Sequence, residues 1–205
     1  KDKNVRLFNG IPLYYYIMKT LIDCKIFQYV IVDTNVEEIK IEAPQVFPQI
    51  KIIDRPEELT AGEISMNDVL HHSLQQVDSE FILQTHSTNP LLGKKTILDA
   101  IEIFYSNYPK HDSLFSVTSL QMRFWDRGPK PINHNPSELL RTQDLKPIYF
   151  ENSSIYIFNR NKFLKIKNRI GINPKMFEMS KIESFDIDDM DDFKLAEALQ
   201  KNLNK

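Results

Sequence analysis

The sequence predicts an α/β fold in three layers, with a mostly parallel β-sheet covered by helices on both faces. The main observation is that short β-rich runs alternate with helical stretches along most of the chain, as they do in successive βαβ units. The second is length, because 205 residues are enough to bury one complete core and no repeat or linker divides them. We therefore expect a single domain over residues 1–205.

The first half of the chain shows this alternation clearly. Pro12 opens an apolar helical stretch that runs to Leu21, since proline is favoured in a first helical turn. The β-rich run 29–32 ends at polar residues, which is typical of a strand followed by a loop. Next we expect a weak helix at 36–41 that ends before Pro44, and a strand at 51–54.

The second half continues the pattern. Ser65 and Asp68 have the spacing of a capping box, which predicts a helix from Ser65 to about Val77. The apolar run 81–84 predicts a buried strand. The remaining expected elements are a helix at 95–105, strands at 113–119 and 153–158, and a last helix from about Asp189.

One long segment lacks this pattern. Residues 120–150 contain the proline-rich stretch Trp125–Pro147, which also carries Asn, His and Arg residues. Connections of this length are uncommon in compact domains unless they have a function of their own. We expect an excursion that serves dimerisation or the active site.

Composition narrows the classes of function. The chain has 26 basic and 28 acidic residues, a balance that does not favour a nucleic-acid partner. No apolar run has the roughly 20 residues needed to cross a bilayer, so we expect no membrane partner. The single cysteine, Cys24, lies in an apolar context typical of a buried structural thiol. A lone cysteine also agrees with a cytoplasmic location.

Polar residues follow several of the predicted strands. In open α/β sheets, ligands bind beyond the carboxyl ends of the strands. The residues expected at that edge are Asp33 to Asn35, Arg55, Gln84 to Asn89, Asp186 and Asp188. No glycine-rich phosphate-binding loop, zinc-ligand spacing or serine-hydrolase motif occurs among the 205 residues.

The most informative segment is an acidic run near the C-terminus, with five aspartates between residues 186 and 192. Asp189, Asp191 and Asp192 are typical of a helix start, where carboxylates meet free N–H groups. If Phe185–Asp188 ends a strand, Asp186 and Asp188 project from one face and suit a shared Mg²⁺. From the residues alone, both an acidic helix start and a magnesium site remain open.

Six segments, in order across nearly the whole chain, match motifs of one enzyme family. They are KNVRLFNGIPL (3–13), RPEEL (55–59), LQTHSTNPL (83–91), RTQDL (141–145), ENSSIYI (151–157) and the DID of residues 186–188 with Asp191. Together they resemble the acylneuraminate cytidylyltransferases, the CMP-sialic acid synthetases. The resemblance implies a Rossmann-like nucleotidyltransferase fold with a protruding dimerisation arm.

The resemblance also implies a reaction. Such enzymes transfer CMP from CTP to a sialic-acid-like 2-keto acid sugar, a nonulosonate, and release pyrophosphate. The sugar hydroxyl attacks the α-phosphorus while Mg²⁺ stabilises the triphosphate charge. No general base for the hydroxyl is evident.

The motifs assign roles to individual residues. By resemblance, Asp186 and Asp188 hold Mg²⁺, and Arg141 reaches the neighbouring subunit's site in a homodimer. The remaining assignments are Lys3, Asn4 and Arg55 to the nucleotide, and Gln84, Asn152 and Tyr156 to the sugar.

The sequence also departs from the family pattern. The family's first strand, in the middle of its sheet, and its nucleotide loop fall upstream of Lys3, where we expect them to precede the given residues. Ser153 stands where the family has glycine, and Arg169 stands near the family's aromatic residues against the acyl sugar. Two alternatives therefore stay open: a cytidylyltransferase for 3-deoxy-manno-octulosonate or another acid sugar, and a non-catalytic nucleotide-sugar-binding subunit.

Overall fold

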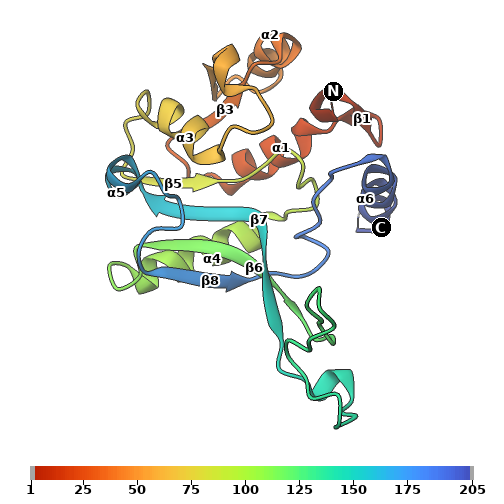
Figure 1. The fold of residues 1–205 in the computed structure, drawn as a ribbon. Helices are drawn as coiled ribbons and strands as arrows, with labels where there is room; N and C mark the ends of the chain where they lie inside the picture. The colour runs from red at the N-terminus through yellow and green to blue at the C-terminus, as the bar shows by residue number, and fades with distance from the viewer. Residues whose placement is uncertain (1–2, 204–205) are drawn as a thin grey trace.

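The computed structural model describes residues 3–203, with a four-stranded mixed sheet at its centre (Figure 1). Strand β7 pairs antiparallel with β5 on one side and with β6 on the other, and β8 runs parallel to β6 at the edge. A separate pair, β3 and β4, is parallel. The bounds of these strands are β3 Val30–Thr34, β4 Ile50–Asp54, β5 Phe81–Gln84, β6 Ser113–Leu120, β7 Ile148–Asn159 and β8 Pro174–Glu178.

Helices cover both faces of this sheet, so the predicted three layers are confirmed. One face packs against α1 and α4, in a core that includes Ile17, Ile97 and Phe104. The other face packs against α3 and α5, in a core that includes Leu70 and Phe163. The helices are α1 Tyr14–Cys24, α2 Glu37–Val46, α3 Met66–Leu74, α4 Lys94–Asn107, α5 Arg160–Ile166 and α6 Met190–Leu203.

The expectation of a mostly parallel sheet is wrong. Both pairings made by β7 are antiparallel, because the long connection after β6 returns the chain beside the strand it has just left. The helix expected to end before Pro44 instead continues through it to Val46. Strand β8, helix α5 and the short hairpin of β1 (Leu7–Phe8) and β2 (Ile11–Pro12) had no clear sequence pattern.

A cavity of about 1080 Å³ separates β3 from β5. Every residue of both strands lines it, and in the part of the chain that the structure describes neither strand has a partner on its other edge. The upstream strand expected in the middle of the sheet lies outside the described residues and stays a prediction.

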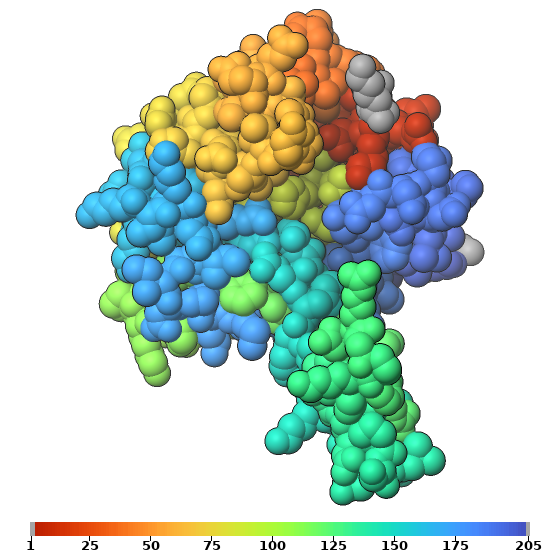
Figure 2. Space-filling view, viewed as in Figure 1, coloured from red at the N-terminus to blue at the C-terminus, as the bar shows by residue number. Residues whose placement is uncertain are grey.

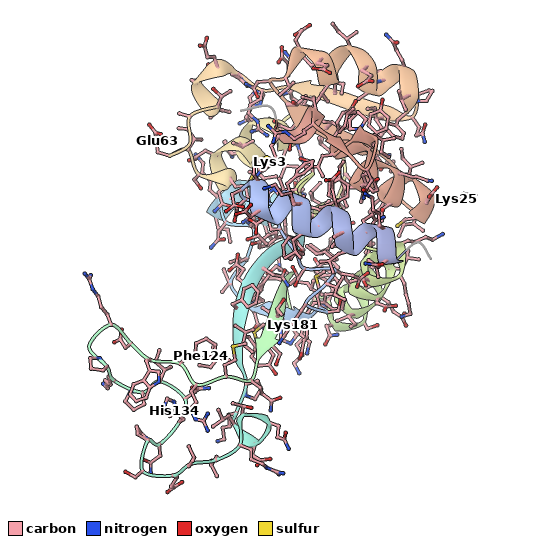
Figure 3. All side chains as sticks on the ribbon, turned by 90° about the vertical axis from the view of Figure 1, so that its right-hand side faces the viewer. Lys3, Lys25, Glu63, Phe124, His134 and Lys181 are labelled. Carbon is pink, nitrogen blue, oxygen red and sulfur yellow. The ribbon has the colours of Figure 1, made fainter. Side chains whose placement is uncertain are left out.

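Residues 121–147, which we call the arm, leave the body between β6 and β7 (Figures 1 and 2). Phe124 and His134 lie on it, away from the helices of the body (Figure 3). The Trp125 and His134 rings contact edge to face at 4.8 Å, and a 3₁₀ turn, η3, spans Thr142–Asp144. The arm lies within residues 120–150, where we expected an excursion, and its role in dimerisation stays a prediction.

Two smaller expectations can be compared directly. Cys24 is 5 % exposed and burial raises its pKa, which agrees with a structural thiol. None of the helices within residues 3–203 is long and apolar enough to span a membrane.

Candidate active site

The loop after β5 is the point where the two ends of the described chain meet. The Ser87 hydroxyl donates to the Asn4 side chain at 3.0 Å, which ties the N-terminal segment to this loop. The Ile187 backbone N–H donates to the Thr88 carbonyl at 3.0 Å, and the Lys3 ammonium donates to the Ile187 carbonyl. Residues separated by more than 180 positions are thus held at one edge of the sheet.

Ile187 fixes the orientation of the two aspartates predicted to bind a metal. Its side chain is fully buried beside Phe8 and Phe193, so Asp186 and Asp188 on either side turn outward. The hypothesis that a strand ends here is wrong, because the segment makes no strand ladder. The alternation of outward and inward side chains comes instead from the burial of Ile187 and from its backbone hydrogen bond to Thr88.

The donor set of this segment fits Mg²⁺, which prefers oxygen ligands and keeps several of its waters. Asp186 lies 3.4 Å from the Asn89 amide nitrogen, and Asp188 is exposed. Across residues 3–203 no three His, Cys, Asp or Glu side chains gather into a metal cluster. A magnesium ion would therefore take only two protein carboxylates and complete its shell with water or phosphate oxygens. That role stays a prediction.

The other three aspartates belong to the start of α6, as predicted. Asp189 Oδ1 accepts from the backbone N–H groups of Asp191 and Asp192, at 2.8 and 2.9 Å. Asp192 Oδ2 accepts in return from the N–H groups of Asp188 and Asp189, both at 3.1 Å. This is a reciprocal capping box. The backbone hydrogen bonds also lower the pKa of Asp189.

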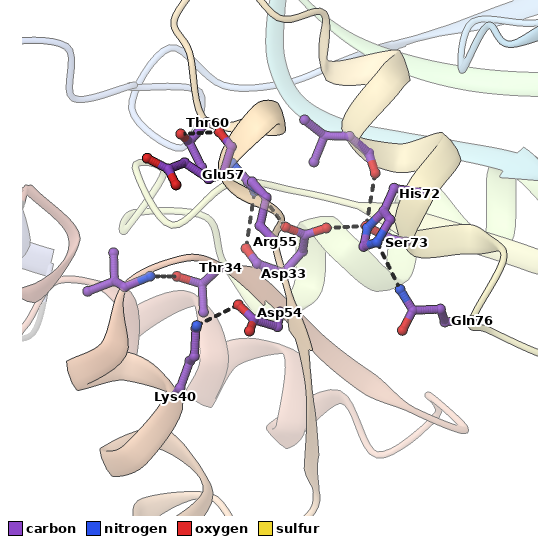
Figure 4. Close-up of polar contacts among 12 residues, drawn as sticks. Asp33, Thr34, Lys40, Asp54, Arg55, Glu57, Thr60, His72, Ser73 and Gln76 are labelled. Carbon is purple, nitrogen blue, oxygen red and sulfur yellow. Dashed lines mark hydrogen bonds and ion pairs between the residues drawn. The ribbon is translucent and has the colours of Figure 1, made fainter.

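Arg55 follows the carboxyl end of β4, beside Asp33 of β3 (Figure 4), and lines the cavity. Its Nε lies 2.6 Å from Asp33 Oδ1, and its Nη2 donates to the Asp33 carbonyl at 3.1 Å. The Ser73 hydroxyl donates to the other oxygen of the same carboxylate. Arg55 is therefore held in place, and Lys3 and Asn4 line the same cavity.

Gln84 and Tyr156 are neighbours across the β5–β7 ladder and form the centre of a polar cluster. The guanidinium of Arg169 lies 3.6 Å above the Tyr156 ring, and its Nη1 donates to Gln84 Oε1 at 2.7 Å. Gln84 Nε2 lies 2.9 Å from His86 Nε2. We call Gln84, His86, Tyr156 and Arg169 the Gln84 cluster.

Burial shifts the pKa values of this cluster. It raises the pKa of Tyr156 to about 12, helped by a hydrogen bond from the phenol to Glu151. Burial, together with the positive charges of Arg169 and Arg55, lowers the pKa of His86 to about 4. His86 is therefore neutral at pH 7, so its Nε2 is free to accept a hydrogen bond from the Gln84 amide.

Asn152 and Arg141 lie elsewhere. Asn152 is 5 % exposed, and its amide donates to Thr118 and accepts from Ser116 within the sheet, at 2.9 and 2.5 Å. Arg141 lies on the arm, where it pairs with Asp144 at 2.8 Å. Neither joins the Gln84 cluster of its own chain. Their predicted roles, in sugar binding and in a partner's site, stay predictions.

The chain is similar to known proteins along most of its length. The family model for cytidylyltransferases matches residues 1–204. The chain is 28% identical to the N-acylneuraminate cytidylyltransferase of a serotype V strain of Streptococcus agalactiae, over 94% of this chain and 48% of that protein. It is also 28% identical to the post-translational flagellin modification protein B of Campylobacter coli, over 100% and 90%.

The chain spans about half the length of several of these relatives, including the streptococcal enzyme. Among solved structures, a CMP:2-keto-3-deoxy-manno-octonic acid synthetase complexed with CTP superimposes with a TM-score of 0.68. That match has 12% sequence identity and covers 98% of this chain and 92% of the other. It establishes a shared fold with a nucleotidyltransferase. Given the match along almost its whole length, the chain belongs to the cytidylyltransferase family.

Proposed function

We propose that this protein transfers CMP from CTP to a sialic-acid-like 2-keto acid sugar, giving a CMP-sugar and pyrophosphate. One observation carries the proposal. The Lys3–Asn4 segment and the Asp186–Asp188 segment are both hydrogen-bonded to the loop after β5, beside the Gln84 cluster. Cations, carboxylates and polar side chains from distant parts of the sequence thus meet at one loop.

The residues have different expected roles, in binding the phosphates, the sugar and the metal ion, according to their charge. Lys3 and Arg55 supply positive charge toward the phosphates of CTP, and Asn4 supplies an amide hydrogen-bonding group. Gln84 and Tyr156, on adjacent strands, would support the sugar side of the site, where the fully buried Tyr156 acts through the Arg169 guanidinium that lies on its ring. Asp186 and Asp188 would hold Mg²⁺, which when bound supplies neutralisation of the triphosphate charge. Positioning and charge stabilisation account for most catalysis in phosphoryl-type transfer.

The arm supports a homodimer as part of the proposal. It exposes several apolar side chains, with Leu139 92% and Trp125 50% exposed. Apolar exposure of this kind on a projecting segment is typical of an interface between subunits. In a dimer, Arg141 of one protomer would lie in the other protomer's site. We also place the reaction in the cytoplasm, in line with the free thiol of Cys24.

Pyrophosphate release tests the proposal. The protein is incubated with CTP, Mg²⁺ and a panel of acid sugars that includes nonulosonates and 3-deoxy-manno-octulosonate. We expect release only when CTP, a nonulosonate and Mg²⁺ are all present, and loss of release with EDTA. Turnover of the octulosonate alone would identify the alternative substrate, and CTP binding without turnover of any sugar would favour the non-catalytic alternative.

A further inference from the structure

Arg169 occupies a loop that the rest of the protein holds firmly. Its backbone N–H donates to Asn67 Oδ1 at the start of α3, at 3.3 Å. At the other end of the loop, the Asp112 carboxylate accepts from two successive backbone N–H groups, those of Ile172 and Asn173, at 3.2 and 2.9 Å. The position of Arg169 is thus fixed from two separate elements.

Gly171 allows this close approach. Its φ of +76° is one that side-chain-bearing residues rarely adopt, and an added Cβ would lie 2.6 Å from Asp112 Oδ1. The Ser113 hydroxyl also donates to the Ile170 carbonyl within the same loop. The loop is therefore a preorganised support for Arg169.

One face of the Arg169 guanidinium lies on the Tyr156 ring, and one of its N–H groups donates a hydrogen bond to the side-chain oxygen Oε1 of Gln84. No carboxylate within residues 3–203 forms an ion pair with it, although Glu151 is bonded to the nearby Tyr156 phenol. A guanidinium has five N–H donors, so several remain for a ligand. Burial lowers the pKa of Arg169, and the charge of Glu151 opposes this only in part. A buried cation that is incompletely compensated favours binding of an oxygen-rich group.

Arg169 lies at the opposite end of the loop after β5 from the predicted magnesium ligands. Arg169 contacts Gln84, the last residue before that loop. At the other end of the loop, the backbone N–H of Ile187, which lies between the two aspartates, donates a hydrogen bond to the Thr88 carbonyl. Four residues span at most about 13 Å when fully extended. The turn in which the Asn89 N–H donates to the His86 carbonyl brings the two ends closer than that, so one sugar ring with a substituent is long enough to join them. A sugar with its reacting hydroxyl near the aspartates would direct its far end toward Arg169.

We propose that Arg169 determines sugar specificity by binding an oxygen acceptor on the substituent farthest from the reacting hydroxyl. This inference rests on the proposed function, because it concerns the acid sugar of that reaction. The substrate class it names is an acid sugar with an acylamino or hydroxyl group at this distal position. A sugar with a free amino group there, which is an ammonium ion at neutral pH, is excluded by like-charge repulsion.

Steady-state kinetics with one acid sugar in three forms, differing only in an acylamino, hydroxyl or amino group at the distal carbon, test this. For the unaltered protein we expect kcat/KM to be at least about 50-fold lower for the amino form than for the acylamino form at pH 7. Arg169→Gln should narrow this ratio to about 5-fold or less, and Arg169→Glu should favour the amino form. The KM for CTP should stay within about twofold, since the nucleotide residues are untouched.

Arg160→Gln is the matched control. Arg160 is also partly buried, and its Nε donates to the Leu74 carbonyl at 2.8 Å, away from the Gln84 cluster. It should leave the preference among the three sugars unchanged. Should Arg169→Gln fail to fold, Arg169→Lys carries the test, because it keeps the charge and should keep rejection of the amino form.

The outcomes separate the two proposals. An unaltered protein that turns over none of the three sugars, nor any other acid sugar, contradicts the proposed function. An active protein whose preference is the same with arginine or glutamine at position 169 overturns the role of Arg169 alone.

Discussion

The neutral state of His86 makes the stability of this protein depend on pH. Burial lowers its folded-state pKa to about 4, against about 6.5 in the unfolded chain. Between these values the unfolded chain binds a proton that the folded chain does not. The free energy of unfolding should therefore have its full His86 contribution above pH 6.5, lose it as the pH falls toward 4, and change no further below that.

His86→Gln removes this titration, and we expect its unfolding free energy to fall less than that of the unaltered protein between pH 7 and pH 4.5. The difference should be roughly 3 kcal/mol or less, as a shift of this size implies. Urea unfolding at both pH values measures it. His134→Gln, on the arm, is the control and should follow the unaltered protein. If the unfolding free energy fell by the same amount in all three proteins between these pH values, the fold would not be holding His86 neutral.

Ser153 is a residue whose backbone conformation disagrees with its type. Its φ is +58°, within the left-handed region, beside the irregular pairing of β6 with β7. Ser153→Gly should raise the free energy of unfolding by about 0.5–1 kcal/mol, because relief of the strain exceeds the entropy that glycine loses. Chemical denaturation measures this.

Ser153→Ala is its control, since it removes the hydroxyl that lies 3.2 Å from the Tyr156 phenol but keeps the strain. A gain in stability for alanine equal to that for glycine would mean that the hydroxyl, not the backbone, is unfavourable. The sequence already indicated a special position here, because glycine is the family's residue where this chain has serine.

At the start of α6, adjacent aspartates are expected to serve different purposes. The side chain of Asp189 caps the helix, whereas the Asp188 carboxylate is exposed and has no part in the capping box. Asp188→Asn should lower kcat by about 100-fold or more with little change in the thermal midpoint, as expected for a metal ligand. Asp189→Ala should lower the thermal midpoint while retaining most of the activity. Pyrophosphate release and thermal unfolding of both variants check these expectations. The metal role would be contradicted if Asp188→Asn lowered the stability of the protein and left its turnover unchanged.

The elements differ in how well the sequence predicts them. Elements with a clear local pattern agree with expectation to within a few residues. Examples are the apolar runs of β3 and β5 and the helical stretch of α4. The direction of β7 was not predictable in this way, since it depends on where the arm returns the chain. The two-residue strands β1 and β2 are too short to show any period. In Phe185–Asp188, polar and apolar residues alternate as they do in a strand, but the segment pairs with no other strand, so the sequence pattern alone was misleading.

Across the whole molecule, the candidate site was predictable where motifs mark it and not where the fold creates it. Lys3, Asn4, Asp186 and Asp188 belong to motifs, and the structure brings their segments to one loop. The contacts of Arg169 had no such signal, because they depend on a loop fixed by the distant Asn67 and Asp112. The only sequence indication was that arginine stands near aromatic positions of the family.

If the arm exchanges between subunits, each active site combines residues of two chains. Arg141→Ala and Asp188→Asn should each abolish most activity alone. In a mixed dimer, however, one site carries both changes and the other carries neither. Subunits that are mixed in equal amounts and exchanged at random form mixed dimers half of the time, so about a quarter of the original activity should return.

The matched control is a mixture of Asp186→Asn with Asp188→Asn. Both aspartates belong to one chain's site, so every site in that mixture stays defective and no activity should return. The measurement is pyrophosphate release after co-refolding, with light scattering to verify the dimer. Recovery in neither mixture, from proteins shown to be mixed dimers, would place Arg141 outside the partner's site. The arm would then be an interface without a catalytic contribution.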